Sequence, residues 1–393
     1  MNLLYYVFFA VQILVGIHFL MPLFFYIISL LKKKKTNVEV GGEADYAVIV
    51  TAYLQVTQVP FAVNSILKAN YNNYIIYVVA DNCDVSGLHF EDQRVVVLRP
   101  EEVLASNTKS HFYAINRFKR PHERLTIIDS DNLVHQEYFN ELNKVFDQGY
   151  EAVQGVRAAK NLDTTYACLD EAGDIYYRLV DRKLMFEAGS SAALSGSGMA
   201  FTTALYRNCL ETTEILGAGF DKILQYEIIS RGKRIAFAEH AVVYDEKTSK
   251  TDQLVNQRSR WINTWFKYLF LGAKMMIRSV GRVDWNQFLF STMLLRPPLF
   301  MLIMISFLFF ILDLFIMPVF ALYWVLCVFF FIAAVFSALS YFQADGRIYK
   351  SLKNAPKFIY FQILALLKAR RANQISIATE HYHEEKIDDS NKV

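Results

Sequence analysis

The sequence predicts an α/β domain with a mostly parallel central sheet, flanked by transmembrane helices. Two observations support this class. Several short runs of β-branched and aromatic residues occur in the middle of the chain, and polar segments of helical length separate some of them. Hydrophobic residues make up 54% of the 393 residues, and the excess is clustered. A soluble domain between membrane-spanning segments accounts for both observations.

The first apolar segment runs from Leu3 to Leu31 without a formal charge and stops at four consecutive lysines, Lys32 to Lys35. About 20 apolar residues are enough to cross a bilayer. A cleavable signal peptide normally has basic residues before its apolar core, and here they come after it. We therefore expect a retained transmembrane helix within residues 1–35, with the lysines on the cytoplasmic side.

A second apolar block follows Arg296-Pro297-Pro298 and ends near Tyr341, with a break near Met317-Pro318. Its length predicts two transmembrane helices within residues 294–342, so the chain returns to the cytoplasm. Asp313 is the only acid in this block. An acid inside a membrane is usually functional or paired, but near a helix end it can reach the headgroups, and we favour this second interpretation.

Two further segments are amphipathic rather than continuously apolar. Within residues 262–293, the stretch from Trp265 to Ile277 mixes aromatic residues with lysines. Residues 343–393 contain a similar stretch, Phe358 to Leu367, followed by a polar tail that we expect to be disordered. Each amphipathic segment is expected either to lie in the membrane interface, which we favour, or to pack as an ordinary helix on the domain.

The soluble domain is expected within residues 36–261. Its predicted strands are residues 46–51, 75–80, 94–98 and 125–128, and polar segments at 58–69 and 109–119 have helical length. Apolar strands separated by helices indicate a sheet that is covered on both faces. Such sheets bind ligands at the carboxyl ends of their strands.

Acidic residues follow two of these strands. Asp81 comes after the second, and Asp129-Ser130-Asp131 comes after the fourth. Two carboxylates at one edge of a sheet can hold a hard divalent cation, which in turn can hold a diphosphate. Taken singly, each motif is better explained by a helix cap or a turn.

Three more motifs lie downstream. Asp221, after Gly217-Ala218-Gly219-Phe220, can cap a helix or act as a general base. Gly196-Ser197-Gly198 is either a plain turn or a place where backbone approaches a sugar closely. Gln257-Arg258-Ser259-Arg260-Trp261 combines two cations with an indole, which suits a diphosphate and a pyranose ring, although a basic helix beside the membrane has the same composition.

The order of these motifs resembles the D, DxD, D, QxxRW series of membrane-bound family 2 glycosyltransferases, the group that includes cellulose, chitin, hyaluronan and poly-N-acetylglucosamine synthases. The resemblance covers about Tyr46 to Trp261 and implies a GT-A fold. It implies a metal-dependent, inverting transfer of a sugar from a nucleotide sugar, with UDP as the first choice of nucleotide, to a glycan or lipid-linked acceptor. The implied cofactor is Mg²⁺ or Mn²⁺.

The resemblance also implies roles for individual residues. Asp131, assisted by Asp129, would bind the metal, and Asp221 would deprotonate the acceptor hydroxyl. Residues implied to contact the nucleotide sugar are Tyr53, Gln55, Asp81, Lys109 and Asp129. Residues implied to contact the diphosphate or the acceptor are Gly196, Ser197, Gln257, Arg258, Arg260 and Trp261. The chain departs from the family pattern at Gln55 and Phe220, since the family usually has a glutamate at each position.

These features favour polysaccharide or cell-envelope glycan synthesis at a bacterial inner (plasma) membrane, with the catalytic domain in the cytoplasm. A single-sugar glycolipid transferase, of the ceramide or polyprenyl-phosphate type, is the first alternative. A non-catalytic scaffold subunit of an export system is the second. Membrane lipids are expected partners, together with a second copy of the chain or an export protein. A net charge of only +3 gives no broad basic surface for nucleic acid.

Overall fold

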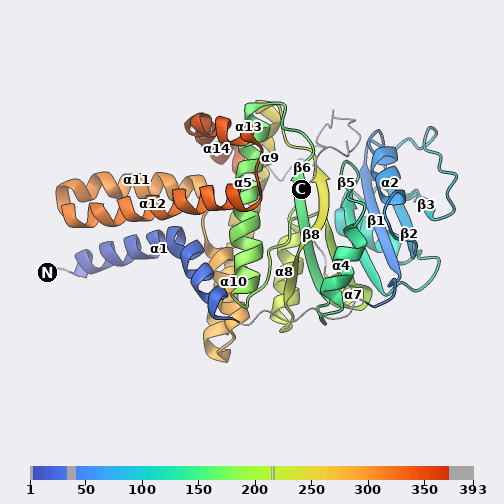
Figure 1. Ribbon diagram of the computed structural model, residues 1–393, viewed down its shortest axis with the longest axis horizontal. Helices are drawn as coiled ribbons and strands as arrows, with labels where there is room; N and C mark the ends of the chain where they lie inside the picture. Colours follow the sequence, from blue (N-terminus) through green and yellow to red (C-terminus); the bar gives the residue numbers. More distant parts are fainter. Residues whose placement is uncertain (1–2, 33–40, 214, 216, 371–393) are drawn as a thin grey trace.

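The computed structural model describes residues 3–32, 41–213, 215 and 217–370. Lys33 to Lys35 and the expected polar tail from His381 to Val393 lie outside the described residues. Within the described part, an α/β domain adjoins three long helices, α1 (Leu3–Leu31), α11 (Leu299–Ile316) and α12 (Pro318–Tyr341). Figure 1 shows these helices projecting together away from the sheet. All three are long and apolar enough to cross a membrane, as the sequence predicts.

A polar cluster joins the three helices of this bundle. Gln12 of α1 donates a hydrogen bond from Nε2 to Oδ1 of Asp313 on α11 (3.1 Å). Trp324 of α12 donates from Nε1 to Asp313 Oδ2 (3.1 Å) and to Gln12 Oε1 (2.7 Å). Asp313 is fully buried. The interpretation that Asp313 reaches the headgroups is therefore wrong, because its carboxyl group finds its donors on the two neighbouring helices.

Eight strands form one sheet in the order β3-β2-β1-β4-β7-β6-β8-β5. The four predicted strands are confirmed, and their bounds are β1 (Tyr46–Tyr53), β2 (Tyr74–Asp81), β3 (Val95–Leu98) and β4 (Arg124–Asp129). The other four are β5 (Leu133–Val134), β6 (Ala152–Ala159), β7 (Met199–Thr202) and β8 (Ile235–Asp245). The sheet is mixed, because β7 runs antiparallel to β4 and β6, and β5 antiparallel to β8. The remaining neighbours are parallel.

Helices cover both faces of the sheet, as the apolar strands predict. Alternate residues of β1 point to opposite sides, with Ala47 and Ile49 in one core and Val48 and Val50 in the other. The second core is closed by α2 (Val59–Leu67) and α4 (Tyr138–Phe146). The first is closed by α3 (Asn107–Ile115), α5 (Thr165–Tyr177), the π-helical segment η1 (Arg178–Leu184), α6 (Met185–Glu187), α7 (Thr203–Leu210) and α8 (Phe220–Ser230).

A single long helix, α9 (Thr251–Arg282), carries both Gln257–Trp261 and the amphipathic segment after it. The domain boundary expected at residue 261 therefore falls inside this helix. It packs against α10 (Trp285–Leu295) and α14 (Ala355–Ala369), and the short α13 (Gly346–Ser351) and η2 (Leu352–Asn354) precede α14. Figure 1 shows α5, α9 and α10 between the sheet and the three apolar helices.

Candidate active site

The strand register aligns the first predicted site residues at one edge of the sheet. Tyr53, the last residue of β1, is paired with Asp81, and Thr51 is paired with Asp129. The buried Asp81 carboxylate accepts hydrogen bonds from the backbone N–H groups of Leu104 (2.9 Å) and Ala105 (2.8 Å). Asp81 therefore anchors the loop that leads into α3 while also lining a cavity at this edge.

Hydrogen bonds to buried side chains fix the position of the loop that carries Asp129 and Asp131. The backbone N–H of Asp129 donates to Ser197 Oγ (3.1 Å), and Ser197 Oγ donates to Asn132 Oδ1 (2.5 Å). Asn132 Nδ2 in turn donates to Asp245 Oδ1 (3.1 Å). Ser197 is fully buried, so it fixes the position of the acidic loop rather than facing the cavities.

Two adjoining cavities lie at this edge. The smaller has a volume of about 320 Å³ and contains Gln55, Asp129, Asp131 and Gln257 among its lining residues. The larger, of about 620 Å³, contains Asp81, Asp221 and Trp261. The two cavities share Thr51, Tyr53, Asn107, Arg157 and Arg260. We therefore treat them as parts of one cleft.

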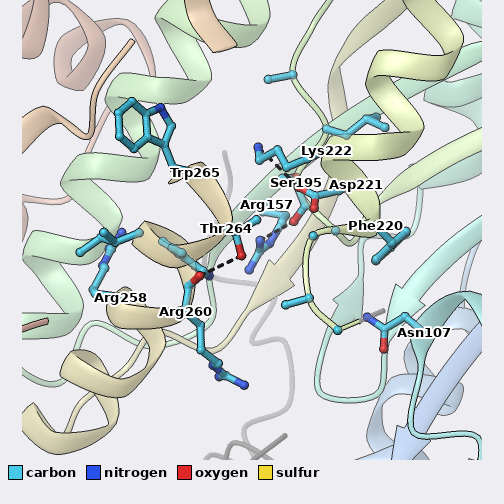
Figure 2. Close-up of a pocket in the computed structure, with 18 of the residues that line it drawn as sticks. Asn107, Arg157, Ser195, Phe220, Asp221, Lys222, Arg258, Arg260, Thr264 and Trp265 are labelled. Carbon is cyan, nitrogen blue, oxygen red and sulfur yellow. Dashed lines mark hydrogen bonds and ion pairs between the residues drawn. The ribbon is translucent and has the colours of Figure 1, made fainter. Parts of the chain in front are cut away.

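Asp221 enters the larger cavity from the first turn of α8. Gly219, the residue directly before the helix, has a left-handed φ of 98°. A Cβ there would lie 2.6 Å from side-chain atoms of both Thr264 and Tyr268 on α9, so only glycine allows this close approach. Lys222 forms an ion pair with Asp221 (3.5 Å). Figure 2 shows Asp221 beside Ser195 and Arg157, across the pocket from Arg258 and Arg260.

A buried histidine supports the start of α8. His111 on α3 is almost fully buried, its Nδ1 lies 2.7 Å from the Tyr206 hydroxyl, and its ring meets the Phe220 ring edge-on. Burial lowers the pKa of His111 to about 3, so its imidazole is neutral at pH 7. Because Phe220 directly precedes Asp221, this packing fixes the backbone position of Asp221, the candidate general base.

The motif on α9 is divided between the two cavities. Arg260 lines both, and burial lowers the pKa of its guanidinium. Arg258 forms an ion pair with Asp170 on α5 and lies over the Trp261 ring, 4.3 Å from its centroid. Trp261 remains 43% exposed at the cavity wall.

A buried group of charges supports the cleft from below. Arg157 on β6 pairs with Asp245 at the end of β8 (2.5 Å). Lys247 contacts Asp245 (3.3 Å), Glu171 (3.1 Å) and Asp174. Burial acts to raise the pKa of Asp245. The nearby cations Arg157 and Lys247 lower this pKa by more than burial raises it, so the net change is downward. The cluster thus holds Arg157 as a fixed cation at the junction of the two cavities.

Most of the predicted site residues are brought together in this cleft. Those that line a cavity are Tyr53, Gln55, Asp81, Asp129, Asp131, Gly196, Asp221, Gln257, Arg258, Arg260 and Trp261. Lys109 is exposed on α3 and lines neither cavity, although Thr108 and Ser110 on either side of it line the larger one. Ser197 is buried and bonds the backbone of the acidic loop.

Sequence reasoning did not identify Arg157, Arg182, Asp245 or Arg296, which also line the cleft. One signal was present: Asp245 ends an apolar run, as Asp129 does. The cations carried no such signal, because each follows an interrupted or charged segment.

The acidic loop suits a divalent cation that shares its ligands with a diphosphate. Asp129 and Asp131 are the two acids of the smaller cavity that come from this loop. Among the described residues, no three His, Cys, Asp or Glu side chains form a complete metal site. Mg²⁺ and similar ions are commonly bound by one or two carboxylates together with water and substrate phosphates, so the residues present fit such an ion.

The comparisons with known proteins agree with this geometry. Residues 44–264, more than half of the chain, match the family described as glycosyltransferase-like family 2. The chain belongs to this family. It is a glycosyltransferase with a GT-A fold. No curated protein sequence matches the chain.

Solved structures similar to this glycosyltransferase include the mannosyltransferase PcManGT from Pyrobaculum calidifontis, in complex with GDP-Man and Mn²⁺. It has a TM-score of 0.55 and 14% identity, with coverage of 91% of this chain and 96% of the other. A second is S. aureus TarS 1-349 in complex with UDP-GlcNAc, with a TM-score of 0.42, 15% identity, and coverage of 84% and 90%.

Proposed function

We propose that this glycosyltransferase moves a sugar, with inversion, from a UDP-sugar to a glycan or lipid-linked acceptor at the cytoplasmic face of a bacterial plasma membrane. One observation carries the proposal. Asp129 and Asp131 line one side of the cleft and Asp221 the other, and Arg260 lines both cavities. The GDP-Man and Mn²⁺ bound to the Pyrobaculum enzyme are consistent with a nucleotide-sugar donor and a divalent ion.

The residues divide the chemistry between the two cavities. Asp131 and Asp129 would hold Mg²⁺ or Mn²⁺, which supplies positive charge to the leaving diphosphate when bound. Arg260 and Arg157 place fixed cations beside the same group. Asp81 and Tyr53 lie where the nucleoside would bind, next to the ends of β1 and β2.

The transfer itself is a single displacement. Asp221 accepts the proton of the acceptor hydroxyl as that oxygen bonds to the anomeric carbon. The bond from this carbon to the diphosphate breaks on the opposite face, which inverts the configuration. Trp261 offers its exposed ring face to the acceptor sugar.

The charge distribution supports a cytoplasmic catalytic domain. Lys32 follows α1, and exposed cations follow α12 at Arg347, Lys350, Lys353 and Lys357. Positive charges beside membrane segments favour the cytoplasmic side. Exposed apolar residues of α9, among them Phe266 (51%), Phe270 (74%) and Ile277 (76%), would rest in the membrane interface.

The polysaccharide synthase and the single-sugar glycolipid transferase differ in product length. Both use the same donor site, so a long polymer in the product supports the first and one added sugar supports the second. The scaffold alternative predicts no turnover at all.

Release of nucleoside diphosphate by the purified full-length protein tests the proposal. Common nucleotide sugars are screened with Mg²⁺, Mn²⁺ or EDTA, and with glycan and lipid acceptors present. The proposal predicts metal-dependent release from one donor, lost in both Asp131→Ala and Asp221→Asn. Asp84→Asn is the matched control, because Asp84 is an exposed acid just beyond β2 that lines neither cavity. Absence of release from every donor, with nucleotide binding confirmed, would favour the scaffold.

A further inference from the structure

The larger cavity has an end that the proposed donor site does not use. None of the residues at this end lines the smaller cavity with the acidic loop. They belong to α5, η1, α9, α10, the α10–α11 connection, α11 and α14, and are Asp174, Tyr177, Asp181, Arg182, Trp265, Met293, Arg296, Pro297, Pro298, Leu299 and Gln362. Leu299 is the first residue of α11, one of the apolar helices. This end of the cavity therefore borders the membrane-spanning part of the protein.

Arg182 is a buried cation in this wall that lacks a partner. Its exposed fraction is 8%. Among the described residues, no hydrogen bond or ion pair engages its guanidinium, and its Nε is buried without an acceptor.

The neighbouring arginines Arg178 and Arg296 each have a carboxylate partner within the chain. Arg296 forms a two-pronged pair with Asp181 (2.9 and 2.5 Å), and Arg178 pairs with Glu171 (2.9 Å). Arg182 thus differs from the cations on either side of it.

Arg182 also stands in an unusual backbone. The π-helical segment η1 interrupts regular helical bonding between α5 and α6. Such segments are rare and occur frequently at functional sites. The π-helical backbone and the absence of a bonded partner are independent observations, and both concern Arg182.

The guanidinium keeps its charge in this position. Burial lowers the pKa of Arg182 to about 10, with Asp174 and Asp181 acting to raise it and Arg178 and Arg157 acting to lower it. At neutral pH it is therefore protonated. A buried charge without a bonded partner is costly, and an anion on a ligand would remove that cost. The planar guanidinium matches the oxygens of a phosphate group well.

We propose that Arg182 binds a phosphate group of the acceptor, and that the acceptor is a saccharide linked through phosphate to a lipid. Its apolar chain would leave between Met293, Pro298 and Leu299 toward α11. This rests on the proposed function, since the acceptor hydroxyl must reach Asp221 in the same cavity. Only the sugar hydroxyl reacts: its oxygen bonds to the donor carbon, its proton goes to Asp221, and the acceptor phosphate is unchanged.

The donor diphosphate is a less suitable ligand for Arg182. Asp129 and Asp131 line only the smaller cavity, whereas Arg182 lines only the larger one. Pro297, Pro298 and Leu299 line the same cavity as Arg182, which also favours a ligand with an apolar part.

Binding of dodecyl phosphate to the full-length protein in phosphatidylcholine nanodiscs tests this proposal without any donor. Trp261 and Trp265 line the cavity, so tryptophan fluorescence reports binding. We expect dodecyl phosphate to bind at least about tenfold more tightly than dodecyl glucoside or inorganic phosphate. Arg182→Gln should remove most of this preference, and Arg182→Lys should retain part of it.

Lys183→Gln is the matched control, since Lys183 is the next residue of η1 but pairs with Glu187 and Glu239 and does not line the cavity. It should bind like the wild type. Equal affinity of Arg182→Gln, confirmed as folded by thermal unfolding, would overturn the proposal. Tighter binding of inorganic phosphate than of dodecyl phosphate would overturn the lipid link. Because no nucleotide sugar is present, these outcomes are separate from failure of the donor screen.

Discussion

The bundle of α1, α11 and α12 and the cleft each bury an ionisable side chain, and the surroundings of that side chain differ between the two regions. Asp313 is surrounded by donors from the other two helices of the bundle, Gln12 and Trp324. Arg182 is nearly as well buried in the cavity wall, yet no group of the described chain is bonded to its guanidinium. Asp313 therefore stabilises the packing of the helices, whereas Arg182 is available to bind a ligand.

The buried charge cluster beside the cleft resembles Asp313, because its charged side chains also have partners within the protein. Lys247 forms ion pairs with Glu171, Asp174 and Asp245. Their role is to hold Arg157 and the acidic loop in place. Substitutions should therefore separate buried charges that stabilise the fold from the one that binds a ligand.

The largest effect is expected for Lys247→Met. Lys247 is 2% exposed among three carboxylates, and removing one partner of a buried pair typically costs about 3–5 kcal/mol. Thermal unfolding of the purified protein measures the loss, with the exposed Lys119→Met as control. A loss below about 1 kcal/mol would mean that the cluster is not stabilised by this cation.

His111 gives a pH-dependent test of whether a buried ionisable group stabilises the fold. Its pKa in the folded protein, about 3, is below the usual 6.5, so protonation favours the unfolded state. The stabilisation is complete above pH 6.5 and decreases by about 1.4 kcal/mol for each pH unit down toward pH 3. Unfolding measured at pH 7 and pH 4.5 should show this extra loss in the wild type and not in His111→Gln. An equal loss of stability in the wild type and in His111→Gln would contradict the low pKa assigned to His111.

A smaller effect is expected in the membrane bundle. Trp324→Phe removes the indole N–H that bonds Gln12 and Asp313 but keeps an apolar ring. Hydrogen bonds between membrane helices contribute about 0.6 kcal/mol on average and up to about 1.7 kcal/mol. We expect a stability loss of about 1 kcal/mol with unchanged donor turnover. Loss of turnover without loss of stability would give the cluster a functional role instead.

The smallest effect on stability is expected for Arg182→Gln. The substitution removes a buried charge that has no bonded partner, so the free energy of unfolding should stay within about 0.5 kcal/mol or rise. Thermal unfolding in the absence of acceptor measures it. A loss of several kcal/mol would show that Arg182 stabilises the fold as Lys247 does.

The sequence alone predicts the part of the fold that is locally encoded. Continuous apolar runs marked β1, β2, β3 and β4, and their shared parallel register places Asp81 and Asp129 at one edge. Long apolar segments, in which Asp313 is the only acid, marked the three helices that could cross a membrane. These features depend on neighbours within a few residues, which is why pattern reasoning finds them.

The buried ion pairs could not be predicted in this way. The α5–η1 segment is rich in charge and resembles an exposed helix, but Asp181 pairs with Arg296, 115 residues away. Strand β6 was missed because Gln154 and Gly155 interrupt its apolar run. Partners so distant in sequence leave no local signal, so Arg157, which pairs with Asp245, was not identified as a site residue. Arg182 was missed because the charge-rich segment around it resembles an exposed helix.

The most direct test compares two acceptors, a lipid-linked saccharide with its phosphate and the same saccharide glycoside without it. Transfer of labelled sugar from the donor found in the release screen is measured for the wild type and Arg182→Gln. We expect the wild type to prefer the phosphate-bearing acceptor by at least about tenfold in kcat/KM, mainly through KM, and the variant to lose this preference. An equal preference in both proteins would contradict the account.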